Sequence, residues 1–211
     1  FISDRDFNPA FSQTEWNHAY LAMSRVYFVT LAKDTKSPFL VIWETTQSCA
    51  LACRHCRAEA MPDRAPDELT TEEGFTLLDR ITGFGHPYPH VVFTGGEPTL
   101  RKDLPELIAH AEKNGQITGI NTNGRRLKDP QFVEALVKAG LDHAQITLES
   151  HDPLVHDGMV AGKAAWEDTI QGIRNVLQTR LFVMTNTTLL KNNTPSLAET
   201  LDFLAELGVP T

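Results

Sequence analysis

The stretch FLVIWETTQSCALACRHC, residues 39–56, joins an apolar run to three cysteines. The run at residues 39–44 has the length and composition of a strand that is buried on both faces. Behind it, Cys49, Cys53 and Cys56 are spaced C-x3-C-x2-C, and the chain has no other cysteine. An odd, clustered set of thiols does not suit a disulfide framework, so we expect a reducing compartment, the cytoplasm, and a metal-binding loop.

Outward from this stretch, strand and helix patterns alternate along the chain. Five strand–helix units in strict alternation predict an α/β fold with parallel pairing and right-handed crossovers. Either an open doubly wound sheet or a barrel fits this order, and the chain ends where a sixth strand would begin. Strands are predicted at 39–44, 90–94, 116–121, 144–148 and 181–187, and helices at 70–81, 104–114, 130–139, 164–178 and 195–207.

Residues 1–38 are interpreted as an N-terminal extension, with a short helix near residues 15–25, and residues 39–211 as one core domain. The chain begins with Phe1 rather than methionine, so residues can be missing ahead of it. The net charge of -8 is not the electrostatic footprint of a nucleic-acid-binding protein. The longest apolar runs are too short to span a bilayer. We therefore expect neither nucleic acid nor a membrane as a partner.

The cysteine loop admits several interpretations. Three thiolates suit a four-iron cluster in which one iron keeps an open position. A zinc site is the first alternative, because His55, His86 or His90 could complete a Cys3His set. Three buried, unreactive cysteines are a second alternative. A protein that only transfers electrons is disfavoured, since such clusters usually use four cysteines.

The tetrapeptide Gly-Gly-Glu-Pro at residues 95–98 directly follows the second predicted strand. The cysteine spacing and this tetrapeptide together resemble the radical S-adenosylmethionine (SAM) superfamily. The segments 41–46 and 56–60 resemble the branch whose members often carry a C-terminal SPASM extension, among them peptide maturases and enzymes of haem and cofactor biosynthesis. The resemblance covers residues 38–211. It implies a partial (β/α)6-type barrel with about five β/α units, its sixth strand cut off.

The resemblance also implies two cofactors, a 4Fe-4S cluster on the three cysteines and SAM on the open iron. Gly95 and Gly96 would let the backbone approach the methionine end of SAM closely. Glu97 would offer a carboxylate to its amino group, and Pro98 would stiffen the turn. His55 stands where many relatives have an aromatic residue before the third cysteine, and it is counted with the cofactor-binding residues.

Five further side chains at strand ends are candidates for contacts with SAM. Asn121 or Thr122 would face SAM after the third strand, although a plain Asn-Gly turn explains them equally. Thr147 would reach the SAM carboxylate, and Glu149 would accept from the ribose hydroxyls. Asn186 would touch the methionyl or ribose part. A solvated loop carboxylate and a satisfied strand-end amide are the alternatives for Glu149 and Asn186.

One departure from the family pattern concerns the loop after the fourth strand. Many relatives carry Arg-Gly shortly after a His-Asp pair, whereas His156-Asp157 is followed here by Gly-Met-Val-Ala at residues 158–161. Arg101 or Lys163 would be the candidates to replace the missing arginine. His151 and His156 are most simply interpreted as surface loop histidines.

The activity that the resemblance implies is reductive cleavage of SAM to a 5'-deoxyadenosyl radical, which abstracts hydrogen from a substrate. A peptide is the preferred substrate, and a small molecule in cofactor or haem biosynthesis is the alternative. A zinc-stabilised binding domain is the alternative that is not an enzyme. A flavodoxin or ferredoxin is expected as the electron donor.

Overall fold

The computed structural model describes residues 10–11, 16–21, 24–29 and 38–210. Eight strands form one sheet in which the spatial order follows the chain. The strands are β1 (Ala10–Phe11), β2 (Trp16–Leu21), β3 (Ser24–Val29), β4 (Leu40–Thr46), β5 (His90–Gly95), β6 (Thr118–Thr122), β7 (His143–Thr147) and β8 (Phe182–Asn186). The helices are α1 (Thr71–Thr82), α2 (Leu104–Lys113), α3 (Pro130–Ala139), α4 (Pro153–Val160), α5 (Ala165–Leu177) and α6 (Leu197–Leu207), with 3-10 turns η1 (Pro98–Leu100), η2 (Arg125–Lys128) and η3 (Thr194–Ser196).

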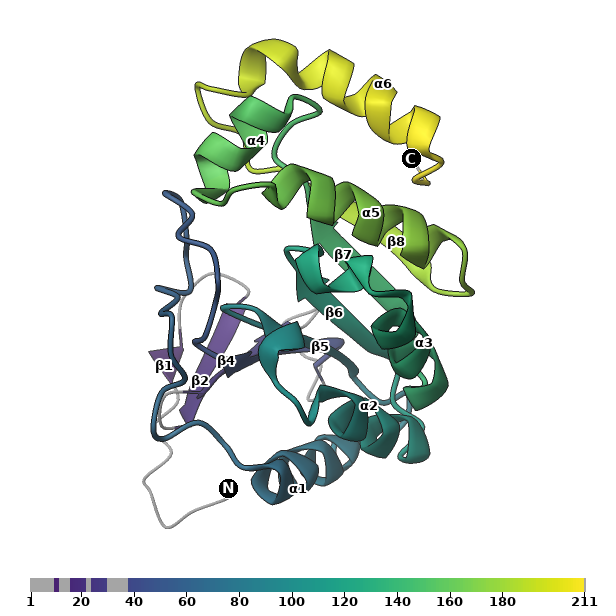
Figure 1. Ribbon diagram of the computed structural model, residues 1–211. Coiled ribbons are helices and arrows are strands. Elements are labelled where there is room, and N and C mark those ends of the chain that lie inside the picture. The colour runs from purple at the N-terminus through teal and green to yellow at the C-terminus, as the bar shows by residue number, and fades with distance from the viewer. Residues whose placement is uncertain (1–9, 12–15, 22–23, 30–37, 211) are drawn as a thin grey trace.

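Strands β4 to β8 are parallel, and each pairs with the next one along the chain. A doubly wound sheet would reverse its strand order at a switch point, and this sheet does not. Right-handed crossovers between sequential strands place the connecting helices on one face. Figure 1 shows α1, α2, α3 and α5 along one side of the curved sheet. The fold is therefore the predicted partial barrel.

The two faces of the parallel strands differ in burial. Residues that point toward the helices, such as Val41, Trp43, Phe93 and Ile146, are fully buried. On β4 their neighbours Leu40, Ile42 and Glu44, on the concave face, are only partly buried, which corrects the prediction that residues 39–44 are covered on both sides. The concave face carries Leu40, Ile42, Glu44, His90, Thr94, Asn121, His143, Gln145, Thr147 and Asn186.

Local signals in the sequence explain where the first helices begin and end. Thr70 and Glu73 form a reciprocal capping box at the start of α1, as the Thr-Thr-Glu-Glu motif predicts. Gly140 ends α3 with φ 100°, a conformation that favours glycine. These helices pack Leu77, Leu78 and other apolar side chains into a single core under the sheet.

The helix predicted at residues 15–25 is wrong where the structure describes that segment. Residues 16–21 and 24–29 are the antiparallel strands β2 and β3, and β3 continues onto β4. Val26, Tyr27, Phe28 and Val29 are β-branched or aromatic, and such residues favour strands. The pairing of β3 with the edge of β4 then outweighs the weaker helical pattern of residues 15–25.

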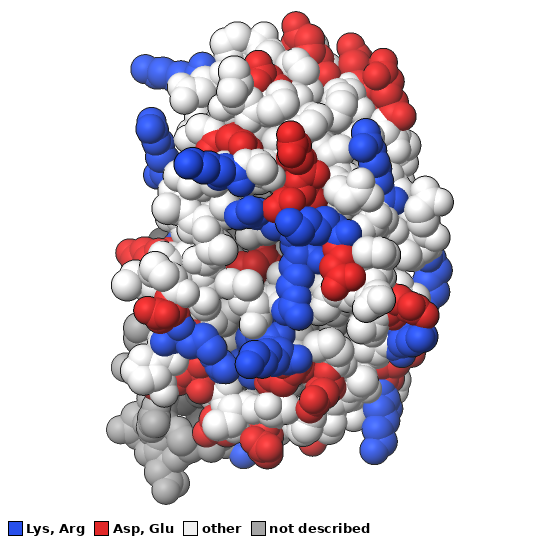
Figure 2. All heavy atoms as spheres, viewed as in Figure 1, with Lys and Arg blue, Asp and Glu red and all other residues white. Residues whose placement is uncertain are grey.

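The loop predicted after the fourth strand contains α4. Asp152 caps this helix by accepting from the Leu154 amide, and Pro153 occupies its first turn. This Asp-Pro pair is a recognisable helix start. Figure 2 shows charged side chains of both signs scattered among uncharged ones on this face. In the described part of the chain, no helix combines the length and apolar character needed to cross a membrane.

Candidate functional site

A pocket of about 270 Å³ lies at the carboxyl ends of the parallel strands, where barrel and doubly wound folds bind their ligands. It brings together side chains from the ends of four strands, β5 to β8, from α4 and from the cysteine loop that follows β4. Glu97 and Pro98 are not in its lining. The predicted residues that do line it are Cys49, Cys53, His55, Cys56, Gly95, Gly96, Asn121, Thr122, Thr147, Glu149 and Asn186.

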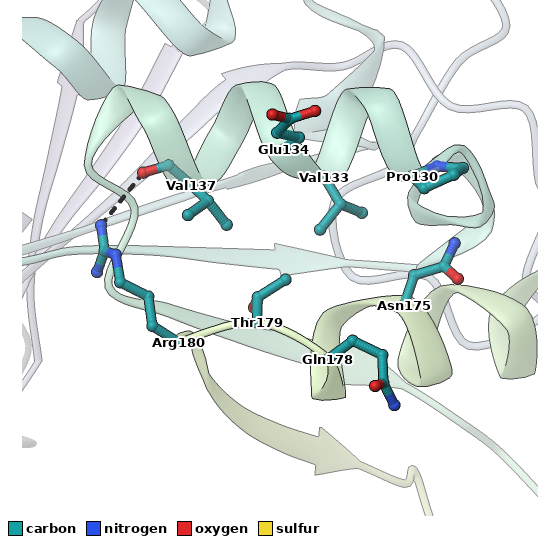
Figure 3. Close-up of a pocket in the computed structure, with 8 residues that line it drawn as sticks. All are labelled: Pro130, Val133, Glu134, Val137, Asn175, Gln178, Thr179 and Arg180. Atoms are coloured by element: carbon teal, nitrogen blue, oxygen red, sulfur yellow. Dashed lines mark hydrogen bonds between the residues drawn. The ribbon is translucent and has the colours of Figure 1, made fainter.

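A larger cavity, of about 510 Å³, lies elsewhere (Figure 3). It is formed by α3 and by the end of α5, with Val133 and Val137 on one side and Thr179 on the other. Arg180 donates to the Val137 carbonyl across it. This cavity is on the helical side of the sheet, contains no cysteine, and brings together no set of residues with an evident chemistry. The smaller pocket is therefore the functional candidate.

The three thiols are free and line the same pocket, with Cys49 buried, Cys53 half-buried and Cys56 exposed. Burial raises the pKa of Cys49, and it raises the pKa of Cys53 from 9.0 to about 11, with the neighbouring cysteines adding to the shift. The Leu51 amide and the Asn123 side chain both donate to the Cys49 sulfur, at 3.4 and 4.0 Å. Metal binding must therefore release protons from this loop.

The zinc alternative finds no support among the described residues. A single zinc ion holds its sulfur ligands within about 4 Å of one another, given zinc–sulfur bonds of about 2.3 Å. No three Cys, His, Asp or Glu side chains in this part of the chain converge on one ion position. His90 is the first residue of β5, at the amino ends of the parallel strands and away from the pocket at their carboxyl ends. His86 packs against Tyr88. All three thiols line one pocket, as the ligands of a single cluster would.

Gly95 and Gly96 allow β5 to approach the entrance of the cysteine loop. A Cβ atom on Gly95 would lie 2.2 Å from the Thr46 carbonyl oxygen, and one on Gly96 would lie 2.4 Å from the Ser48 carbonyl oxygen. The amides of Gly96 and Glu97 donate to those same two oxygens. The close backbone approach in the structure is thus to residues 46–48, just ahead of Cys49.

The Glu97 carboxylate lies buried beside the pocket rather than in its lining. Its Oε1 accepts from the Thr99 and Thr122 hydroxyls at 2.6 and 2.7 Å, and its Oε2 accepts from the Asn123 amide. Burial raises the pKa of Glu97, and these hydrogen bonds oppose that rise. In this structure Glu97 ties the turn after β5 to the turn after β6.

His55 and Glu149 form a contact between the cysteine loop and the end of β7. The His55 Nε2 and the Glu149 Oε1 are 2.8 Å apart, and Glu149 Oε2 accepts from the Thr188 amide. Burial raises the pKa of Glu149, partly opposed by the Thr188 hydrogen bond and by His55. The other ring nitrogen of His55, Nδ1, is buried and has no partner among the described residues. An orphaned polar atom in a pocket rimmed by amides and hydroxyls fits a site built for a polar ligand such as SAM.

Two further strand-end candidates, Thr147 and Asn186, contact one another. The Thr147 hydroxyl donates to the Asn186 side-chain oxygen at 3.0 Å, across β7 and β8. Sequence reasoning missed Gln145, Thr94, Asn123 and Thr188, which also line the pocket. The two-residue period of a strand puts Gln145 on the same face as Thr147, so that signal was present in the sequence.

His156 is buried in α4, so its interpretation as a surface loop histidine is wrong. Its Nδ1 accepts from the Glu149 amide at 3.1 Å, which requires a neutral ring with the proton on Nε2. Burial lowers the pKa of His156 from 6.5 to about 4, with the Asp157 carboxylate opposing the shift. His156, which also lines the pocket, thereby anchors the backbone of Glu149.

We predict that the protein loses about 2 kcal/mol of stability between pH 7 and pH 5 through His156. Below pH 6.5 the unfolded chain binds a proton that the folded chain excludes down to about pH 4. Stability therefore falls as the pH decreases through this window. His156→Asn keeps an acceptor near the Nδ1 position and should flatten the dependence, measured by urea unfolding at each pH. An identical pH profile in the variant would refute this assignment.

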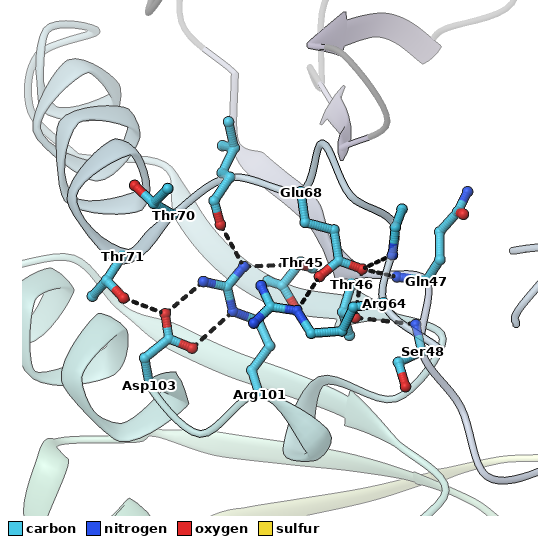
Figure 4. A network of polar contacts seen from close by, with 12 residues as sticks. Thr45, Thr46, Gln47, Ser48, Arg64, Glu68, Thr70, Thr71, Arg101 and Asp103 are labelled. Atoms are coloured by element: carbon cyan, nitrogen blue, oxygen red, sulfur yellow. Dashed lines mark hydrogen bonds and ion pairs between the residues drawn. The ribbon is translucent and has the colours of Figure 1, made fainter. Parts of the chain in front are cut away.

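A buried polar network holds the segment that leads from β4 to Cys49 (Figure 4). Arg101, which is 1% exposed, forms an ion pair with Asp103 and donates to the carbonyls of Thr45 and Leu69. Glu68 accepts from the Thr46 hydroxyl and from the Gln47 amide. Arg101 lies outside the pocket lining, and its guanidinium is engaged by this network.

Val160 and Ala161 stand at the end of α4, in the segment after His156-Asp157 where an Arg-Gly was expected. Val160 packs with Leu51 and Ala165 in a small apolar cluster beside Cys49. The carbonyl of Val160 accepts from the Ala52 amide, so α4 is attached to the cysteine loop. Ala161 has φ 51°, in the left-handed region that favours glycine.

We predict that Ala161→Gly raises the free energy of unfolding by about 0.5–1 kcal/mol, because it relieves a left-handed alanine. Ala109→Gly, at an exposed position inside α2, is the matched control and should lower stability by about 1 kcal/mol. Thermal unfolding of both variants measures the difference. A loss of stability in Ala161→Gly would show that the alanine is not strained.

Comparison with known proteins agrees with this geometry. The family description "Radical SAM superfamily" matches residues 43–204. The chain is 34% identical over 184 residues to the Fe-coproporphyrin III synthase of Methanosarcina barkeri. This match covers 87% of this chain and 45% of that protein. It is 41% identical over 115 residues to the PqqA peptide cyclase of Granulibacter bethesdensis. That match covers 54% of this chain and 30% of the cyclase.

Among solved structures, SuiB of Streptococcus suis bound to its precursor peptide SuiA superposes with a TM-score of 0.68 at 21% identity. That match covers 80% of this chain and 36% of SuiB, and it supports the fold. The chain thus spans less than half the length of these relatives. Enzymes of the matched family use a 4Fe-4S cluster together with SAM. Because the family match covers most of the chain and the fold agrees with it, the chain belongs to the radical SAM superfamily.

Proposed function

We propose that this chain is the catalytic core of a radical SAM enzyme, with residues 39–211 as the core and residues 1–38 as an extension of it. Cys49, Cys53 and Cys56 would hold a 4Fe-4S cluster. When bound, the cluster supplies an electron that cleaves SAM to a 5'-deoxyadenosyl radical, which removes hydrogen from the substrate. The observation that carries the proposal is the convergence of all three thiols with Gly95 and Gly96 in one pocket.

The chain's own groups would bind and orient SAM in this pocket. Thr147, Asn121 and Asn186 present hydroxyl and amide groups at adjacent strand ends. His55 is held by Glu149 beside the cysteines, with its Nδ1 available to a ligand. Glu97 would act through the turns that it ties together, by fixing Thr122 and the Asn123 backbone. The partly buried concave face leaves room for a substrate next to these groups.

The test is anaerobic reconstitution with iron and sulfide. We predict about four irons per chain, a 4Fe-4S spectrum, and release of 5'-deoxyadenosine from SAM after reduction. The Cys49→Ala/Cys53→Ala/Cys56→Ala variant should bind no cluster and cleave no SAM. His86→Ala is the matched control and should behave like the wild type. About one zinc per chain with no sulfide, or unchanged iron in the triple variant, would refute the proposal.

Two substrate classes have support. A peptide, preferred from the sequence, is supported by the likeness to the PqqA peptide cyclase and by the fold shared with peptide-bound SuiB. An iron tetrapyrrole is supported by the wider match to the Fe-coproporphyrin III synthase, which covers 87% of this chain. Because a synthase is named for its product, the full-length enzyme is incubated with other iron tetrapyrroles, and formation of Fe-coproporphyrin III is measured to separate the two classes. Its formation, with faster release of 5'-deoxyadenosine, would favour the tetrapyrrole class, and no response would favour a peptide.

A further inference from the structure

Basic side chains gather just outside the pocket, on η2 and after η1. We call the set Lys102, Arg125, Arg126 and Lys128 the basic patch. The Arg126 guanidinium donates to the Thr99 carbonyl and lies 4.1 Å from the centre of the Phe132 ring, so it joins the two turns. Figure 2 shows Lys and Arg side chains in a band through the middle of this face. None of the four residues lines the pocket.

The charge of this patch is opposite in sign to that of the chain. Asp168 pairs with Arg125 at 3.0 Å and with Lys128 at 2.8 Å, and Asp129 follows as the cap of α3. Four cations against these two carboxylates leave an excess of positive charge, whereas the whole chain carries -8. An acidic partner would be repelled by most of the surface and attracted here. Such local complementarity steers the encounter and fixes its orientation.

The basic patch is also adjacent to a cluster ligand. The Arg125 amide donates to the Asn123 side-chain oxygen at 3.0 Å, and the Asn123 side-chain nitrogen donates to the Cys49 sulfur at 4.0 Å. One residue therefore separates the backbone of η2 from the thiol. The next residue of η2, Arg126, contacts η1, and η1 directly follows Glu97. A redox protein on this surface would be close to Cys49 while the pocket mouth stays open.

We propose that the basic patch docks the acidic protein that supplies the reducing electron, a step that rests on the proposed function. The docked donor passes one electron to the cluster and is itself oxidised by one electron, and no covalent bond forms between the proteins. The position of the patch outside the pocket lets donor and substrate bind together. Salt should weaken the interaction, because exposed charges carry it.

Direct binding tests the docking without any turnover. The probe is an oxidised, acidic flavodoxin, titrated by calorimetry into the full-length protein at low and high salt. Lys102→Glu/Lys128→Glu should weaken binding at least about tenfold and remove most of its salt dependence. Arg80→Glu/Lys113→Glu is the matched control, because it changes the net charge equally at exposed ends of α1 and α2. Equal binding by the two double variants would overturn the proposal.

A second measurement separates failure of the docking from failure of the proposed function. SAM cleavage is driven either by reduced flavodoxin or by titanium(III) citrate, a small reductant that needs no docking surface. The patch variant should lose about tenfold in rate with flavodoxin and keep its rate with titanium citrate. Equal losses with both reductants would overturn the docking assignment. Absence of SAM cleavage by the wild type with titanium citrate would instead refute the proposed function.

Discussion

Replacing Arg101 with methionine is expected to lower the free energy of unfolding by about 3–5 kcal/mol. The substitution leaves the Asp103 carboxylate without its cation and removes the donor to the Thr45 and Leu69 carbonyls. Methionine fills much of the same volume, so the loss reports the missing charge and hydrogen bonds rather than a cavity. Urea unfolding of the apoprotein measures it.

Two controls make this result specific to the buried pair. Arg64→Met removes an ion pair with Glu68, but that arginine side chain is 54% exposed, so the expected loss is at most about 1 kcal/mol. Arg101→Met/Asp103→Leu removes both charges and should recover much of the stability lost in the single variant. Similar losses for Arg101→Met and Arg64→Met would contradict the role assigned to the network.

Gly95→Ala is expected to destabilise the fold by about 4 kcal/mol and to prevent assembly of the cysteine loop. Gly95 has φ 139°, in a region that is almost restricted to glycine and costs other residues about 1–3 kcal/mol. The added Cβ would also meet the Thr46 carbonyl oxygen, a backbone atom that cannot move aside, and overpacking adds about 1–3 kcal/mol. Calorimetric unfolding and iron content after reconstitution measure the two effects.

Two other glycines separate the cost of the positive φ from the cost of the steric clash. Gly85 also has a positive φ, of 87°, but a Cβ there would meet nothing within 4 Å, so Gly85→Ala should cost only about 1–2 kcal/mol. Gly158 lies in α4 with open space around it, and Gly158→Ala should raise stability by about 1 kcal/mol. If Gly95→Ala lowered the stability no more than Gly85→Ala, the close contact of β5 with Thr46 would not contribute to the cost of the substitution.

The sequence predicted those elements whose signals are local. The capping box at Thr70 and the glycine at 140 mark helix ends by their own chemistry, and five apolar runs mark the parallel strands. The strands at 16–21 and 24–29 escaped prediction because their pairing partners, each other and β4, are set by tertiary structure. The α4 helix escaped prediction, although the Asp-Pro pair at residues 152–153 is a local signal for a helix start.

The candidate site was predictable in composition but not in its contacts. Strand ends at one edge of a parallel sheet must meet, so the sequence could place Cys49, Asn121 and Asn186 in one pocket. It could not show that Glu149 contacts His55, which is 94 residues away in the chain. It also could not show that Glu97 is enclosed by hydroxyl and amide donors from β6 and the turn after it. The roles of these residues toward SAM stay predictions.

The antiparallel pairing of β3 with β4 limits how the barrel can be completed. Both edges of β4 are occupied, by β3 and by β5, so β8 has no free edge of β4 to pair with and the parallel strands cannot close into a ring. Among the described strands β8 pairs only with β7, so further parallel strands can be added only beside β8, while β1 is the other, antiparallel edge of the sheet. The catalytic chamber would thus keep a lateral gap, through which a bulky molecule could reach the radical sideways instead of along the barrel axis.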